Sequence, residues 1–184
     1  MKVVYLFAAA FLLTASSLGY AQTRQRPTRW QVFSPPDKGF KIEVPAKPRR
    51  IDDLYGDTDP NGYKSIDVYG VSQSSPIRRE YQIIVLVPSE GMRKERPDGD
   101  ELGGLEFTIG GDNAEPESES DIKVGNFRGK ELIYALTDAE ALGHRKGRII
   151  DAGTKVFVLI YATDAASDLG SSAAARFFNS FKVM

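Results

Sequence analysis

The chain has 184 residues, no cysteine, one histidine and a formal net charge of −1. Without cysteine there is no disulfide framework, and one histidine cannot supply the cluster of ligands that a zinc site needs. A net charge close to zero argues against a nucleic-acid-binding chain. We therefore expect no metal, no cofactor and no nucleic-acid partner.

The first 21 residues have the three parts of a secretory signal peptide. Lys2 supplies a positive charge, residues 3–13 are almost wholly apolar, and small residues precede a predicted cleavage between Ala21 and Gln22. The apolar run is shorter than the roughly 20 residues that cross a bilayer. We therefore expect export to the periplasm or the extracellular space, with the signal peptide removed and no stable membrane insertion.

Residues 22–28 are polar and basic and are predicted to form a disordered lead-in, and residues 29–184 a single domain. Residues 30–33 alternate between apolar and polar types, which predicts a strand. Two prolines and a glycine in residues 34–39 predict a turn. Residues 40–45 alternate cleanly and predict a half-buried antiparallel strand that ends at a proline.

Residues 47–50 are predicted to be a basic connector, with a possible further strand at residues 51–55. Alternation predicts a strand over residues 63–71. Residues 81–87 form a continuous β-branched run, which predicts a central strand that is covered on both faces. The turn-forming segment between these strands has Asp57, Asp59 and Asn61 at alternate positions. This spacing fits a calcium loop only in part, and a hairpin tip is the preferred interpretation.

The segment from Asp98 to Asp121 contains nine acidic residues and no lysine or arginine. We expect a long acidic loop around residues 98–121, with one short element between its two glycine pairs. The loop carboxylates could bind calcium, but the simpler interpretation is a solvated acidic surface.

A strand and turn are predicted over residues 122–129, a strand over 130–137 and a turn over 138–143. Residues 144–150 and 155–163 are predicted to form a hairpin, because Gly153 supplies a positive backbone angle between them. An aromatic-faced helix should follow, with apolar residues spaced by four. It could be capped by Asp164 or Ser171, and Gly170 favours the later start. The apolar face consists of Leu169, Ala173, Phe177 and Phe181, widened by Ala174 and Phe178.

Few residues are candidates for chemistry. His144 lies among cations without a nucleophile motif, so a surface hairpin histidine is favoured over a catalytic base. The basic groups could form a patch for an anionic partner, although scattered solvated charges are the preferred interpretation; they are Arg78-Arg79, Arg93-Lys94-Arg96 and Arg145-Lys146-Arg148. We assign no catalytic, cofactor-binding or metal-binding residue.

Residues 30–35 (WQVFSP), 39–45 (GFKIEVP) and 176–182 (RFFNSFK) resemble exported bacterial members of the PsbP-like family, which shares its fold with the import factor Mog. The resemblance covers about residues 29–184. It implies an α+β fold, an α/β/α sandwich with a central antiparallel β-sheet and a C-terminal helix packed on it. The known roles of the family are non-catalytic, in binding partners and supporting assemblies.

We therefore expect an exported, monomeric, non-catalytic binding or assembly-support module rather than an enzyme. It should recognise a protein partner through a sheet edge or the acidic loop. Two other classes remain open at this point: an envelope hydrolase that uses carboxylates, and a calcium-dependent or lipid-surface binding protein.

Overall fold

The computed structural model describes residues 29–51, 62–95, 104–111, 114–136 and 142–184. Within these ranges, strands dominate and helices are short. The strands are β1 (Gln31–Phe33), β2 (Phe40–Val44), β3 (Arg49–Arg50), β4 (Tyr63–Gln73), β5 (Arg79–Pro88), β6 (Ser118–Val124), β7 (Phe127–Ala135), β8 (His144–Asp151), β9 (Val156–Thr163) and β10 (Lys182–Val183). The helices are α1 (Glu90–Glu95), α2 (Glu106–Gly110), a 3₁₀ helix (Ala166–Gly170) and α3 (Ser172–Ser180).

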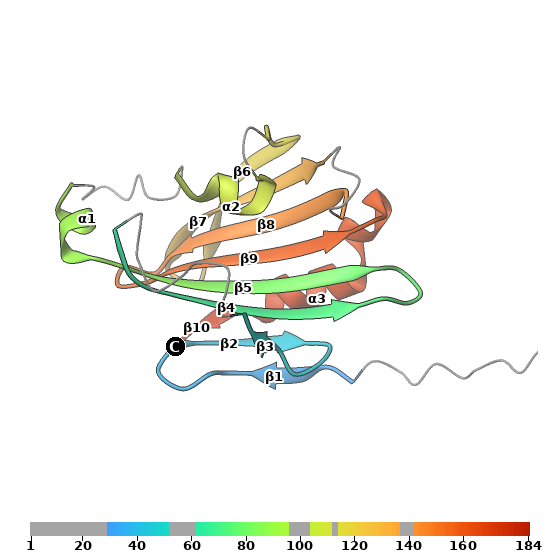
Figure 1. The fold of residues 1–184 in the computed structure, drawn as a ribbon, viewed down its shortest axis with the longest axis horizontal. Helices are drawn as coiled ribbons and strands as arrows, with labels where there is room; N and C mark the ends of the chain where they lie inside the picture. The colour runs from blue at the N-terminus through green and yellow to red at the C-terminus, as the bar shows by residue number, and fades with distance from the viewer. Residues whose placement is uncertain (1–28, 52–61, 96–103, 112–113, 137–141) are drawn as a thin grey trace, which may run out of the picture.

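The main sheet has seven strands in the order β3-β4-β5-β9-β8-β7-β6, and each neighbouring pair is antiparallel (Figure 1). The centre is formed by β5 and β9, the two continuous apolar runs, with Ile83 opposite Leu159. Every residue of β9 is buried. Strand β5 lies between β4 and β9, so the prediction that residues 81–87 form a central strand is confirmed. A continuous apolar run favours this position because both of its faces need cover.

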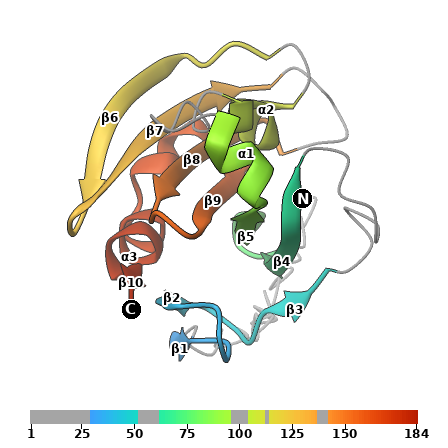
Figure 2. The same ribbon diagram turned by 90° about the vertical axis from the view of Figure 1, so that its left-hand side faces the viewer.

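Each face of the sheet carries its own apolar core. Figure 2 shows the helices α2 and α3 on different sides of the sheet. One face is covered by α3 and by a three-stranded sheet of order β1-β2-β10. The other face is covered by α2, through the buried Leu105 beside it and Ile109 within it. The predicted α+β sandwich with a central antiparallel sheet and a packed C-terminal helix is therefore confirmed.

The C-terminal helix α3 begins at the later of its two predicted starts. The Oγ of Ser171 accepts a hydrogen bond of 3.2 Å from the backbone N–H of Ala174 and so caps the helix. The side chains of Phe177, Phe178 and Phe181 are buried against the sheet. They provide the apolar cover that β9 requires, as the four-residue spacing predicted.

Several predicted boundaries were wrong. Strand β3 occupies Arg49–Arg50, where a connector was expected, because Arg50 reaches the buried Asp67 at 3.0 Å and the segment pairs with β4. Strand β4 continues to Gln73, since β5 pairs along its whole length. The short β10 after α3 was not predicted. It adds to β2, with Val183 opposite Phe40.

The acidic segment is also more regular than predicted. Its middle forms α2, which confirms the short element between the glycine pairs. Its last part, from Ser118, is the first half of β6, because backbone pairing with β7 is compatible with charged side chains that point into solvent. The possible calcium residues Asp57, Asp59 and Asn61, the turn at 138–141 and the remaining acidic residues 98–101 and 112 lie outside the described residues. The predicted signal peptide and its cleavage between Ala21 and Gln22 lie there as well.

Candidate functional site

Those candidates for catalysis or metal binding that lie among the described residues do not form a shared site. His144 starts β8 opposite Thr163, and the described part of the chain gives its side chain no hydrogen bond or ion pair. No group of three or more His, Asp or Glu side chains could hold a metal ion among the described residues. The described acidic residues Glu106 and Glu119 instead bind Lys130, at 3.1 and 2.5 Å.

The described basic residues of the candidate patch on β8 make separate contacts. The guanidinium of Arg145 donates to the carbonyl of Ile109 on the α2 side of the sheet, at 2.8 Å. On the α3 side, Lys146 and Arg148 both bind Glu131 at 2.7 Å and lie against the ring of Phe178. Although burial opposes its ionisation, these two cations lower the pKa of Glu131. The side chains of residues 93–96 are outside the described part.

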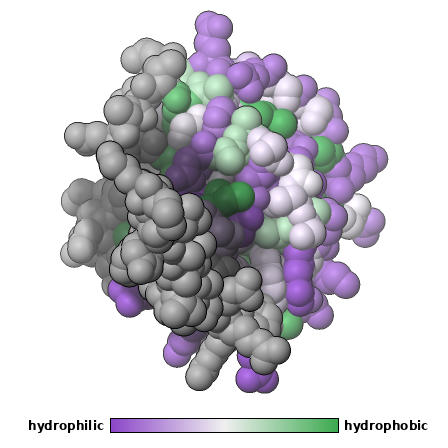
Figure 3. Space-filling model, turned by 90° about the vertical axis from the view of Figure 1, so that its right-hand side faces the viewer, coloured by the Kyte–Doolittle hydropathy of each residue, from purple (hydrophilic) through white to green (hydrophobic). Residues whose placement is uncertain are grey.

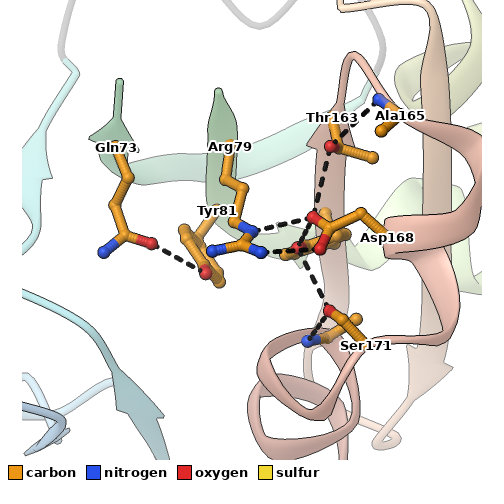
Figure 4. Close-up of polar contacts among 9 residues, drawn as sticks. Gln73, Arg79, Tyr81, Thr163, Ala165, Asp168 and Ser171 are labelled. Carbon is orange, nitrogen blue, oxygen red and sulfur yellow. Dashed lines mark hydrogen bonds and ion pairs between the residues drawn. The ribbon is translucent and has the colours of Figure 1, made fainter. Parts of the chain in front are cut away.

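The most highly connected polar group in the described chain joins β5, β9 and the 3₁₀ helix (Figure 4). Arg79 donates two hydrogen bonds to Asp168, from Nε to Oδ2 at 2.7 Å and from Nη2 to Oδ1 at 2.6 Å. Tyr161 Oη and Thr163 Oγ1 also donate to Oδ2, the latter at 3.2 Å. Close to Arg79 on β5, Tyr81 Oη donates a hydrogen bond to Gln73 Oε1 of β4 at 3.0 Å.

We call the group formed by Arg79, Tyr161, Thr163 and Asp168 the clamp, and its electrostatics stabilise the contact between these residues. Hydrogen bonds, above all from Arg79, lower the pKa of Asp168 to about 2, and the same pair raises the pKa of Arg79. Burial, together with the hydrogen bond to Asp168, raises the pKa of Tyr161 to about 12. The carboxylate is therefore ionised near neutral pH and accepts four hydrogen bonds from three side chains. The clamp joins the start of β5 and the end of β9, two central strands, to the 3₁₀ helix.

A cavity of about 490 Å³ lies between β3 and the ends of β4 and β5. Its lining includes Lys47, Arg49, Ile51, Ser72, Glu80 and Gln82. From the sequence, only the basic character of residues 47–50 was predicted, and the cavity was not. Figure 3 views the molecule from the end where the β4–β5 connection lies. Hydrophilic side chains predominate there, and apolar ones occur in small groups around a hollowed area.

The opposite edge of the sheet is formed by β6, which pairs with β7 alone among the described strands. A two-residue turn at Gly125 (φ 62°) and Asn126 makes Val124 and Phe127 the first hydrogen-bonded pair of the hairpin. Because such pairs alternate along an antiparallel ladder, the backbone N–H and C=O groups of the residues in the alternate positions point away from β7. These residues are Glu119, Asp121 and Lys123.

Comparisons with known proteins add a statement about fold only. No family model matches the chain, and no curated protein matches it. A solved structure of CyanoP, the cyanobacterial PsbP of Synechocystis sp. PCC 6803, is similar at 16% identity and a TM-score of 0.49, over 91% of this chain and 99% of that one. A protein of unknown function from Pseudomonas aeruginosa is similar at 15% identity and a TM-score of 0.40, over 79% and 90%.

Both neighbours have a TM-score below 0.5. At these identities the likeness concerns the fold and does not extend to a partner or an activity. Among the described residues, no helix is long and apolar enough to span a bilayer.

Proposed function

We propose that the chain is an exported, non-catalytic, monomeric binding module, and that a protein partner adds a strand to the free edge of β6. The observation that carries the proposal is the row of outward-facing backbone groups at Glu119, Asp121 and Lys123, on a seven-residue edge strand. Proteins commonly recognise extended peptides by such strand addition, in which main-chain hydrogen bonds supply affinity. The proposal includes neither nucleic acid nor membrane insertion.

The side chains of β6 support this use of the edge and suggest its selectivity. Glu119 is held by Lys130, and the exposed Asp121 is its acidic neighbour on the same face of the strand. Acidic side chains on an edge strand discourage pairing with unsuitable chains. A partner strand with basic residues opposite these positions would be accepted, because cross-strand pairs of opposite charge are favourable.

The test uses two substitutions at one position. Asp121→Pro removes an outward N–H and places a ring where the partner strand would lie, while the hydrogen bonds between β6 and β7 stay intact. Asp121→Ala removes the same carboxylate but keeps the N–H. The tagged full-length chain and both variants are expressed in the native host, captured from its envelope, and their bound proteins are quantified by mass spectrometry.

We expect a specific protein to be retained by the native chain and by Asp121→Ala, and to be lost from Asp121→Pro. Thermal unfolding must show that the proline variant is still folded. An identical set of captured proteins from all three chains would contradict binding at the β6 edge. Capture of nothing above an unrelated exported protein would remove the support for a binding module altogether.

A further inference from the structure

The cavity at the β3 edge lies at the opposite side of the sheet from β6. Its volume of about 490 Å³ falls within the range of roughly 300–1,000 Å³ that is usual for small-ligand sites. It is bounded by β3, by the segment before β3, and by the ends of β4 and β5. The β6 edge and this cavity are separate features, so the inference below does not depend on the proposed function.

Strand alternation places Arg49, Ile51, Ser72, Glu80 and Gln82 of the lining on one face of the sheet, whereas the side chains of Val71 and Tyr81 belong to the core on the α3 side. Arg50 reaches Asp67 on the α3 side of the sheet, so Arg49 and Ile51 lie on the α2 side. Arg49 pairs with Gly70, and a Cβ at Gly70 would come within 2.8 Å of Ile51 Cδ1. Ile51 is therefore packed closely over β4 and supplies an apolar wall to the cavity.

The positive charge of this cavity is not neutralised within the described residues. Lys47 and Arg49 are both exposed and have no ion pair or hydrogen bond there, unlike the other arginines of β3 and β5. The acidic residue in the lining, Glu80, is bound by Arg78 at 3.6 Å. Among the described residues, the rim of the cavity therefore has two cations without an acidic partner, and an acid that has a cationic neighbour.

The rest of the lining is neutral. Ala46 and Ile51 are apolar, whereas Ser72 and Gln82 carry polar groups with no side-chain hydrogen bond in the described part of the chain. A ligand that matches this lining has one anionic group for the cations and neutral donors, and a compact apolar body for the wall. An inorganic anion would leave the apolar part of the cavity unused.

We propose that this cavity binds a small amphiphilic carboxylate, whose anionic end is held by Lys47 and Arg49 and whose apolar body lies against Ile51 and Ala46. Charge-assisted hydrogen bonds from the two cations supply the main recognition of the carboxylate. The apolar contact distinguishes such a ligand from phosphate or chloride.

Titration of the full chain with octanoate, followed by amide NMR and calorimetry, tests this assignment. We expect saturable binding with shifts of the amide signals of Ser72 and Gln82, and much weaker binding of octylammonium and of inorganic phosphate. The double variant Lys47→Gln/Arg49→Gln should weaken octanoate binding by about tenfold or more. Ala46→Phe, which fills the cavity from an exposed position without a change of charge, should also weaken it.

The matched control is Lys41→Gln/Lys182→Gln, which removes the same charge from exposed positions on β2 and β10. It should bind octanoate like the native chain. The proposal is overturned if octanoate does not bind, if octylammonium or phosphate binds as tightly, or if the cavity variants bind like the control.

Discussion

Arg79 on β5 holds Asp168 of the 3₁₀ helix with two parallel hydrogen bonds, of 2.7 and 2.6 Å. The two residues are 89 positions apart in the sequence, and the pair fixes the segment before α3 to the centre of the sheet. The side chain of Asp168 is 4% exposed and that of Arg79 17%. Geometry and burial together make this the ion pair on which the C-terminal part of the fold depends most.

Substitution Asp168→Asn should lower the free energy of unfolding by about 2–3 kcal/mol, because it leaves a poorly hydrated guanidinium without its carboxylate. The value is placed below that of a fully buried pair, since Arg79 keeps some contact with solvent. Urea denaturation at pH 7 measures it. The matched control is Asp151→Asn, whose partner Arg128 is 53% exposed, and there we expect a loss below about 1 kcal/mol. Equal losses at both positions would contradict the importance of the Arg79–Asp168 pair.

The same carboxylate predicts a decline of stability in acid. Its pKa in the folded chain, about 2, lies below the ordinary 3.8, so folding favours the ionised form. This contribution is complete above about pH 4 and is lost as the pH falls through about 2, and it amounts to about 2 kcal/mol. Urea denaturation of the native chain and of Asp168→Asn at pH 5 and pH 2.5 should show that their difference shrinks at the lower pH. A constant difference would show that Asp168 does not titrate as described.

How far the sequence predicts this structure depends on the range of the interactions. Alternation and apolar runs identified β2, β5 and β9, because burial of a strand face leaves a local pattern. The pairing of Arg79 with Asp168 leaves no such pattern, since neither residue has a distinctive neighbour. The cavity was missed for the same reason, as its wall combines residues 46–51 with residues of β4 and β5 that are distant in the sequence. Strand β6 was predicted in part, because its acidic first half is typical of a loop and is ordered only by pairing with β7.

The cap of α3 is a local feature that the sequence did predict. Ser171→Ala removes the acceptor for the Ala174 N–H and should cost about 1 kcal/mol of unfolding free energy. Ser172→Ala, at the exposed first residue of the helix, is the matched control and should change stability by less than about 0.5 kcal/mol. Thermal or urea unfolding of both variants checks this difference. Equal losses of unfolding free energy in the two variants would show that α3 does not depend on this cap.

The contact of α2 with the sheet requires a glycine on β8. A Cβ at Gly147 would lie 2.3 Å from Ile109 Cδ1 and 2.7 Å from its Cγ1 and Cγ2, so Ile109 occupies the space above the strand. We expect Gly147→Ala to destabilise the chain by about 1–3 kcal/mol through overpacking. Gly170→Ala, at a position where a Cβ meets nothing within 4 Å, is the control and should be close to neutral.

A double-mutant cycle separates overpacking from a general effect on β8. Ile109→Ala alone leaves a space in the core and should cost about 2–5 kcal/mol. In the double variant the new methyl group of residue 147 partly fills that space. The loss of unfolding free energy in the double variant should therefore be smaller than the sum of the losses in the two single variants, by at least about 0.5 kcal/mol. Unfolding in urea of the four chains measures this coupling. Strict additivity would mean that α2 does not rest on Gly147, and the packing of this face of the sheet would have to be different from the one described.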